Sequence, residues 1–126
     1  MSELEALRAI GRALNTLSVE PLIPLLADGV TFFSQTSWVD PKGKQDVVAY
    51  LDQKFSAARA SGQRTWAEVG HLKCYPGGPC LVVSTVSPET PQWTFLVKVN
   101  EGKITEITAA IIPEPQQSIR TGEFPI

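Results

Sequence analysis

The stretch that decides the fold is QWTFLVKVNEGKITEITAAII, residues 92–112. Apolar side chains alternate along 92–99, so they share one face of a predicted strand. These side chains are Trp93, Phe95, Val97 and Val99. The next residues, 100–102, predict a hairpin turn in which Gly102 takes a positive φ. The strand over 103–112 then returns antiparallel to the first.

Further strands are predicted upstream of this hairpin. Residues 64–75 and 80–87 have strand character and are joined by the Pro-Gly-Gly-Pro turn at 76–79. A short strand over 30–35 is rich in β-branched and aromatic residues. The C-terminal half is therefore predicted as a meander of four strands, preceded by one short strand.

Three helices are predicted before the meander. The first follows the capping box of Ser2 and Glu5, and its apolar stripe leaves Asn15 on the opposite, polar side. The stripe consists of Leu4, Leu7, Ile10, Leu14 and Leu17. A short second helix is predicted over 21–26, with Asp28-Gly29 ending it. A third helix runs from about 44 to 60.

Helices segregated from antiparallel hairpins indicate the α+β class, with three N-terminal helices packed on a twisted, mainly antiparallel sheet. A chain of 126 residues fits one domain over 1–126, with 116–126 as an extended or mobile tail. Hydrophobic residues make up 43% and charged residues 19%, as in globular proteins. The net charge of −2 argues against a nucleic-acid partner. No apolar run is long enough for a membrane span, and the start lacks secretory-signal features, so we expect a cytoplasmic protein.

The order of these elements resembles the nuclear transport factor 2-like (NTF2-like) superfamily, also called the SnoaL-like or cystatin-like α+β cone. The resemblance rests on the striped first helix, on LLADGVTF at 25–32, on Gly43-Lys44 opening the long helix, and on EGKITEI at 101–107. It implies a curved sheet around the long helix, a pocket between them, and a homodimer through the outer face of the sheet. This fold hosts isomerases, dehydratases, cyclases, ligand binders and adaptors, so it does not name a function.

Three residues are candidates for proton transfer. The ketosteroid isomerase branch implies a carboxylate where this sequence has Ser34, so that machinery is missing. Glu68, which shares a strand face with Trp66, is the best carboxylate candidate if that face points inward. His71 is the one imidazole and a possible general acid or base. Asp40, near Trp38, is a third candidate, although it also suits a turn.

Four aromatic residues are candidates for ligand binding: Trp38, Tyr50, Trp66 and Trp93. The spacing of His71, Cys74 and Cys80 does not match a zinc site, and the cysteines are expected to be reduced. We predict no metal and no cofactor. The sequence favours a binding protein for an apolar or aromatic small molecule. The alternatives are an isomerase, dehydratase or hydrolase using these acidic groups or His71, and a non-catalytic dimerisation or interaction module.

Overall fold

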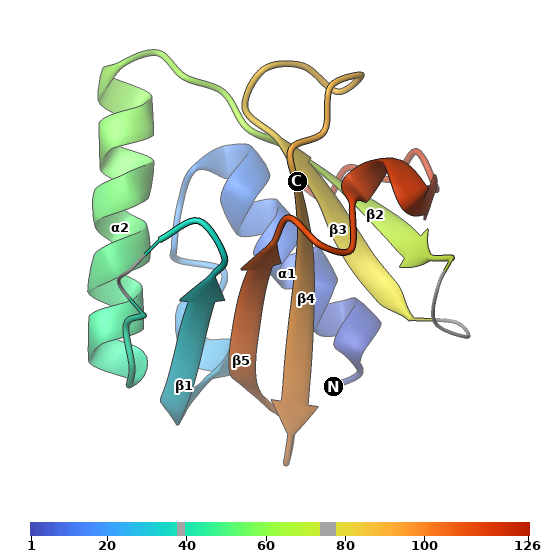
Figure 1. The fold of residues 1–126 in the computed structure, drawn as a ribbon. Coiled ribbons are helices and arrows are strands. Elements are labelled where there is room, and N and C mark those ends of the chain that lie inside the picture. The colour runs from blue at the N-terminus through green and yellow to red at the C-terminus, as the bar shows by residue number, and fades with distance from the viewer. Residues whose placement is uncertain (38–39, 74–77) are drawn as a thin grey trace.

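The computed structural model of the chain describes residues 1–37, 40–73 and 78–126. It contains a six-stranded sheet with two α-helices on one side, α1 (Glu3–Thr16) and α2 (Lys44–Ala60) (Figure 1). The strands are β1 (Leu26–Ser34), β2 (Trp66–Leu72), β3 (Pro79–Ser84), β4 (Trp93–Asn100), β5 (Lys103–Ala110) and β6 (Ser118–Arg120). Two 3-10 turns, η1 (Ile23–Leu25) and η2 (Pro115–Gln117), complete the described elements. The predicted α+β class is confirmed.

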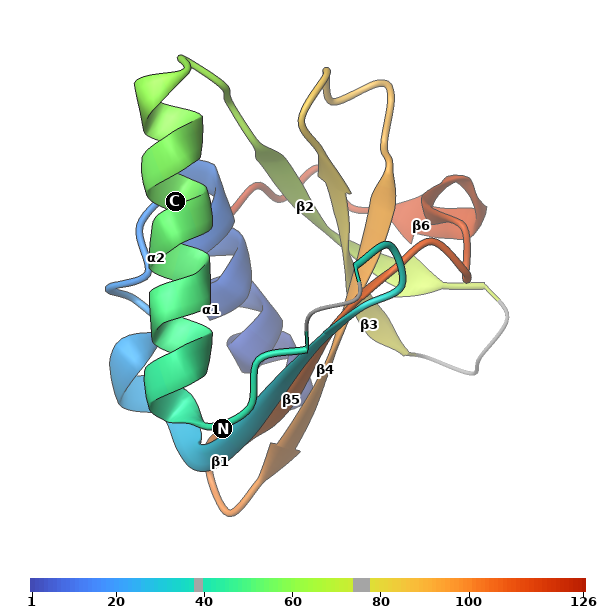
Figure 2. The same cartoon turned by 60° about the vertical axis from the view of Figure 1, so that its left-hand side comes forward.

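The sheet has the strand order β1-β5-β4-β3-β2-β6. β1 runs parallel to β5, and the other neighbouring pairs are antiparallel. The hairpin predicted from 92–112 is present as β4 and β5, and Gly102 has the expected positive φ of 74°. Figure 2 shows the curvature of the sheet, with both helices on the same side.

The two helices cover different parts of the sheet. The capping box is present, since Glu5 N donates to Ser2 Oγ and Ser2 N donates to the Glu5 carboxylate. α1 packs on β2, β3 and β4, whereas α2 packs mainly on β1. The shorter α1 thus lies on the central strands, while the long helix, around which the resemblance implied a curved sheet, lies over β1. This arrangement leaves room between α2 and the sheet.

The predicted second helix is wrong: the described chain has two α-helices, not three. Residues 23–25 form a single 3-10 turn, in which Leu25 N donates to Leu22 O. Pro24 has no N–H to continue a helix, and the chain enters β1 at Leu26. Gly29 therefore lies inside β1 and does not cap a helix.

The C-terminal segment, expected as an extended or mobile tail over 116–126, is extended and adds a strand to the sheet. β6 pairs antiparallel with β2, and Val69 N donates to Glu123 O at 2.9 Å just beyond β6. Figure 1 shows the red turn η2 on the side of the sheet opposite α1, whereas the residues after β6 reach α1, where Asn15 Nδ2 donates to Pro125 O at 2.7 Å. Pro115 of η2 and Ser118 of β6 are buried. The outer face of β2 and β3 is thus partly covered by the chain itself.

Candidate functional site

A cavity of about 360 Å³ lies between α2 and the inner face of the sheet. The helices contribute apolar and aromatic side chains, and the strand ends contribute hydroxyl groups. Its described lining consists of Leu14, Phe32, Ser34, Thr36, Ser37, Tyr50, Leu51, Lys54, Phe55, Thr65, Val83, Thr85, Trp93, Phe95 and Ala109. Its size falls in the range of small-molecule pockets.

Aromatic rings form the deep part of the cavity. Phe32 of β1 lies 5.5 Å from Tyr50 of α2 and 6.3 Å from Phe95 of β4, measured between ring centroids, with the second pair edge to face. Phe55 is buried one helical turn beyond Leu51 on the same face of α2. Such spacings are typical of favourable aromatic contacts, so this part of the wall is packed and preformed.

Polar groups gather where the strands end. Ser34 closes β1, and its Oγ lies 3.0 Å from Thr36 Oγ1. Thr85, just after β3, donates from its hydroxyl to Gln92 Oε1 at 2.9 Å. Lys54 lies one turn beyond Tyr50 on α2, and its Nζ is 5.5 Å from the Tyr50 ring centroid. The cavity therefore combines an apolar interior with hydroxyls and one ammonium group.

The ionisable side chains on the described cavity wall are those of Tyr50 and Lys54; no Asp, Glu or His is among them. The wall can therefore provide apolar and aromatic contact, hydroxyl hydrogen bonds and one positive charge. These are properties for holding and orienting a ligand.

Glu68 lies on the other face of the sheet. It pairs with Val82, whose side chain belongs to a second buried cluster, whereas the neighbouring Val83 lines the cavity. Its carboxylate accepts from Arg120 Nε at 2.7 Å and from Gly122 N at 2.7 Å. Glu68 is inaccessible because the C-terminal segment covers it. The hydrogen bonds from Arg120 and Gly122 explain how a carboxylate on a residue that is only 4% exposed is tolerated.

His71 and Asp40 are exposed and do not line the cavity. His71 lies near the end of β2, between Pro79 of β3 and Ile119 of β6. Asp40 precedes Pro41, whose carbonyl accepts from Phe32 N at 3.1 Å. Glu68, His71 and Asp40 are thus not brought together, and a proton-transfer role for each stays a prediction.

The aromatic candidates separate in the same way. Tyr50 and Trp93 both line the cavity. Trp66 pairs with Ser84 on the outer face, where Arg64 lies over its ring at 5.0 Å. Trp38 and Cys74 lie outside the described residues. Cys80 is buried, and its thiol is 3.7 Å from Ser118 Oγ.

Sequence reasoning missed several wall residues, including Lys54 and the hydroxyl group at the end of β1. The four-residue spacing of Tyr50 and Lys54 could have placed them on one side of α2. For the hydroxyls no such signal exists, because which strand ends meet depends on the parallel pairing of β1 with β5.

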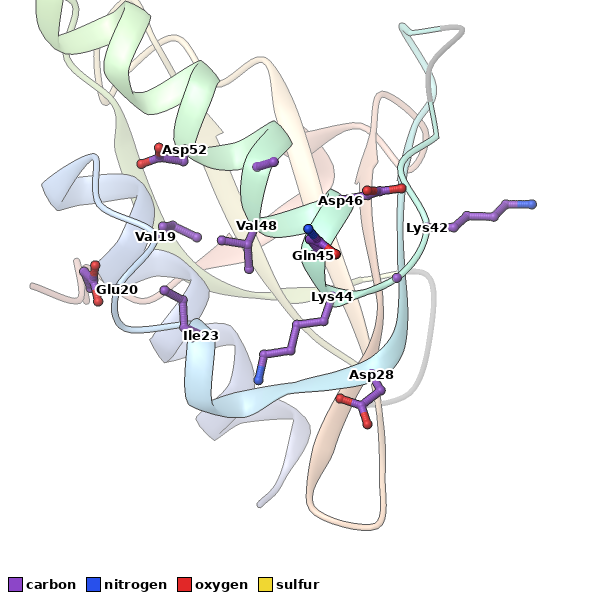
Figure 3. A pocket seen from close by; sticks show the side chains of 12 residues that line it. Val19, Glu20, Ile23, Asp28, Lys42, Lys44, Gln45, Asp46, Val48 and Asp52 are labelled. Carbon is purple, nitrogen blue, oxygen red and sulfur yellow. The ribbon is translucent and has the colours of Figure 1, made fainter.

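A larger hollow of about 850 Å³ lies on the outside, between the turn before β1 and the first turns of α2. Figure 3 shows Val19, Ile23 and Val48 at its centre, with Lys42 extending away from them. Charged side chains of both signs line this groove: Glu20, Asp28, Lys42, Lys44, Asp46 and Asp52. Because this groove is the more open of the two to water, which screens its charges, the aromatic cavity is the better candidate site.

No helix within 1–37, 40–73 and 78–126 is both long and apolar enough to cross a bilayer. In the same residues, no three His, Cys, Asp or Glu side chains are grouped so that they could hold a metal ion.

No protein-family model matches the sequence, and no curated protein matches it significantly. Solved structures do match. A Mycobacterium tuberculosis protein in complex with estradiol-17beta-hemisuccinate is 22% identical, with a TM-score of 0.61, over 85% of this chain and 91% of that one. A cystatin-fold protein from Novosphingobium aromaticivorans is 19% identical (TM-score 0.62, 87% and 98% covered). An NTF2-like protein from Cytophaga hutchinsonii is 15% identical (TM-score 0.60, 92% and 95% covered). The chain therefore has the NTF2-like, cystatin-like fold that its sequence predicted.

Proposed function

We propose that this protein binds an apolar or aromatic small molecule in the cavity between α2 and the inner face of the sheet. The observation that carries the proposal is a cavity of about 360 Å³ with aromatic side chains from α2, β1 and β4 around it. Apolar surface removed from water contributes about 25 cal/mol per Å², so a flat ring system placed against these walls gains about a few kcal/mol. A solved structure with the same fold, from Mycobacterium tuberculosis, contains a steroid derivative, which supports a ligand of this kind.

Trp93 is the side chain through which the proposal is best tested. Its indole lines the cavity, whereas Trp66 has the same chemistry on the opposite face of the sheet. Calorimetric titration with the neutral probe naphthalene-2-carboxamide should detect binding to the native chain. Trp93→Ala should weaken this binding at least about tenfold, the cost of losing one aromatic contact surface. Trp66→Ala should change it less than about twofold.

Thermal melts of both variants establish that they are folded before titration. Absence of binding by the native chain, or equal weakening by the two tryptophan substitutions, would count against this cavity as the binding site. The enzymatic alternative stays a prediction. It requires Glu68, His71 or Asp40 to act from outside the described cavity wall.

Pairing of two copies through the outer face of the sheet also stays a proposal. Leu72, Val82 and Leu96 pack together on that face, and the buried Pro115 and Ser118 belong to the segment crossing it. A dimer that uses this face must include the C-terminal segment in its interface or use the strands left open beside it. Sedimentation at micromolar concentration distinguishes a dimer from the 13.7 kDa monomer.

A further inference from the structure

We propose that the cavity selects ligands that carry an acidic group, with the anion paired to Lys54 and the ring system against the aromatic walls. This inference rests on the proposed binding function and names the chemical class of the ligand. The class is an aromatic or other apolar carboxylate.

Lys54 is the charged side chain on the described cavity wall. It projects from the same side of α2 as Tyr50, with its Nζ 5.5 Å from the tyrosine ring centroid. The ion pairs of the described residues use Arg8, Lys98 and Arg120, and none involves Lys54. The ammonium group therefore has no carboxylate of the described chain to neutralise it, and a bound anion can take that place.

Two hydroxyls of the cavity wall can add a hydrogen bond to a bound carboxylate. Ser34 and Thr36 place two hydroxyls beside each other at the end of β1, where one donates to the other and the second keeps its O–H for a carboxylate oxygen. A cationic ligand would be repelled by Lys54 and would meet no carboxylate on the described wall. Such an arrangement discriminates between ligands by their charge, while the aromatic surfaces supply affinity for the ring system whatever charge the ligand carries.

Two probes of equal shape separate charge from ring binding: naphthalene-2-carboxylate and the neutral naphthalene-2-carboxamide. Calorimetric titrations at pH 7 would use the native chain, Lys54→Gln and the control Lys42→Gln. Lys42 lies in the outer groove, so its substitution changes the net charge equally without touching the cavity. The native chain should bind the carboxylate about fivefold more tightly than the amide, the upper size of a solvent-accessible charge pair.

In Lys54→Gln the ratio of carboxylate affinity to amide affinity should fall to about one, because the carboxylate binds more weakly while the amide binds as before. In Lys42→Gln the fivefold preference should persist. A native chain that binds both probes equally, or a preference that survives Lys54→Gln, would overturn the charge selection while leaving ring binding intact. Failure of both probes to bind would instead reject the cavity function itself.

Discussion

Asn15 of α1 joins three parts of the fold through its side chain. Its Nδ2 donates to Ala67 O at 2.9 Å and to Pro125 O at 2.7 Å, and its Oδ1 accepts from Ala67 N at 2.8 Å. Ala67 is fully buried in β2, and its backbone groups on that side lie beyond the end of β6. The amide of Asn15 thus takes the place of one more strand residue.

The loss in free energy of unfolding expected from Asn15→Ala follows from these contacts. Three hydrogen bonds at about 1 kcal/mol each give about 3 kcal/mol, and the buried Ala67 N–H and C=O lose partners that water cannot easily replace. With a urea m-value of about 1.5 kcal/mol per molar, the unfolding midpoint should fall by about 2 M. Asn15→Asp keeps the acceptor for Ala67 N but removes both donors, so it should lower the free energy of unfolding by about two-thirds as much as Asn15→Ala does.

Urea unfolding followed by circular dichroism measures the change. Thr16→Ala is a matched control, because the neighbouring Thr16 is exposed and bonds only within α1, to Arg12 O. We expect the control to change the free energy of unfolding by less than about 0.5 kcal/mol. If Asn15→Ala costs less than about 1 kcal/mol, the bridging role assigned to this amide is refuted.

Two further predictions concern the C-terminal segment. The hydrogen bond and charge of Arg8 lower the pKa of Glu123 below its ordinary value, so this pair stabilises the fold at neutral pH and the contribution is lost as the pH falls through the lowered pKa. Glu123→Gln should therefore reduce the urea midpoint at pH 7 but not at a pH below that lowered pKa; an equal loss at both would contradict the ion-pair account. Alanine at Gly11 would place its Cβ 3.0 Å from Pro125 Cγ, so Gly11→Ala should not give the usual gain of about 1 kcal/mol for a helix interior. In a Pro125→Ala background part of that gain should return, and an equal effect in both backgrounds, read from thermal melts, would show that Pro125 is not the obstacle.

Patterns among neighbouring residues predicted the elements whose contacts are mainly between residues close in the chain. The third predicted helix, from about 44 to 60, has the observed bounds of α2, and the 92–112 hairpin is present with its positive-φ glycine. The short helix over 21–26 was not correct, because one proline reduced it to a 3-10 turn. Propensity alone did not reveal that the following residues extend β1.

Contacts between distant segments were beyond sequence reasoning. Alternation placed Glu68 and Trp66 on one face of β2, but it could not tell which face was inner. Both faces are apolar here because the C-terminal segment covers part of the outer one. Asn15, assigned to the polar side of α1, contacts Ala67 and Pro125, far from it in the chain. Tyr50 and Trp93 do line the cavity, as composition suggested because aromatic residues often line cavities, and their role in binding stays a prediction.

The pairing of β6 with β2 also bears on how the protein is made. During synthesis β2 and β3 emerge well before residues 118–123, so the nascent chain exposes a bare strand edge for the whole interval. Unpaired edges template association with other chains. Slow translation or early termination before residue 118 should therefore favour aggregates over native protein, even though α1, α2 and the central hairpin have already been synthesised.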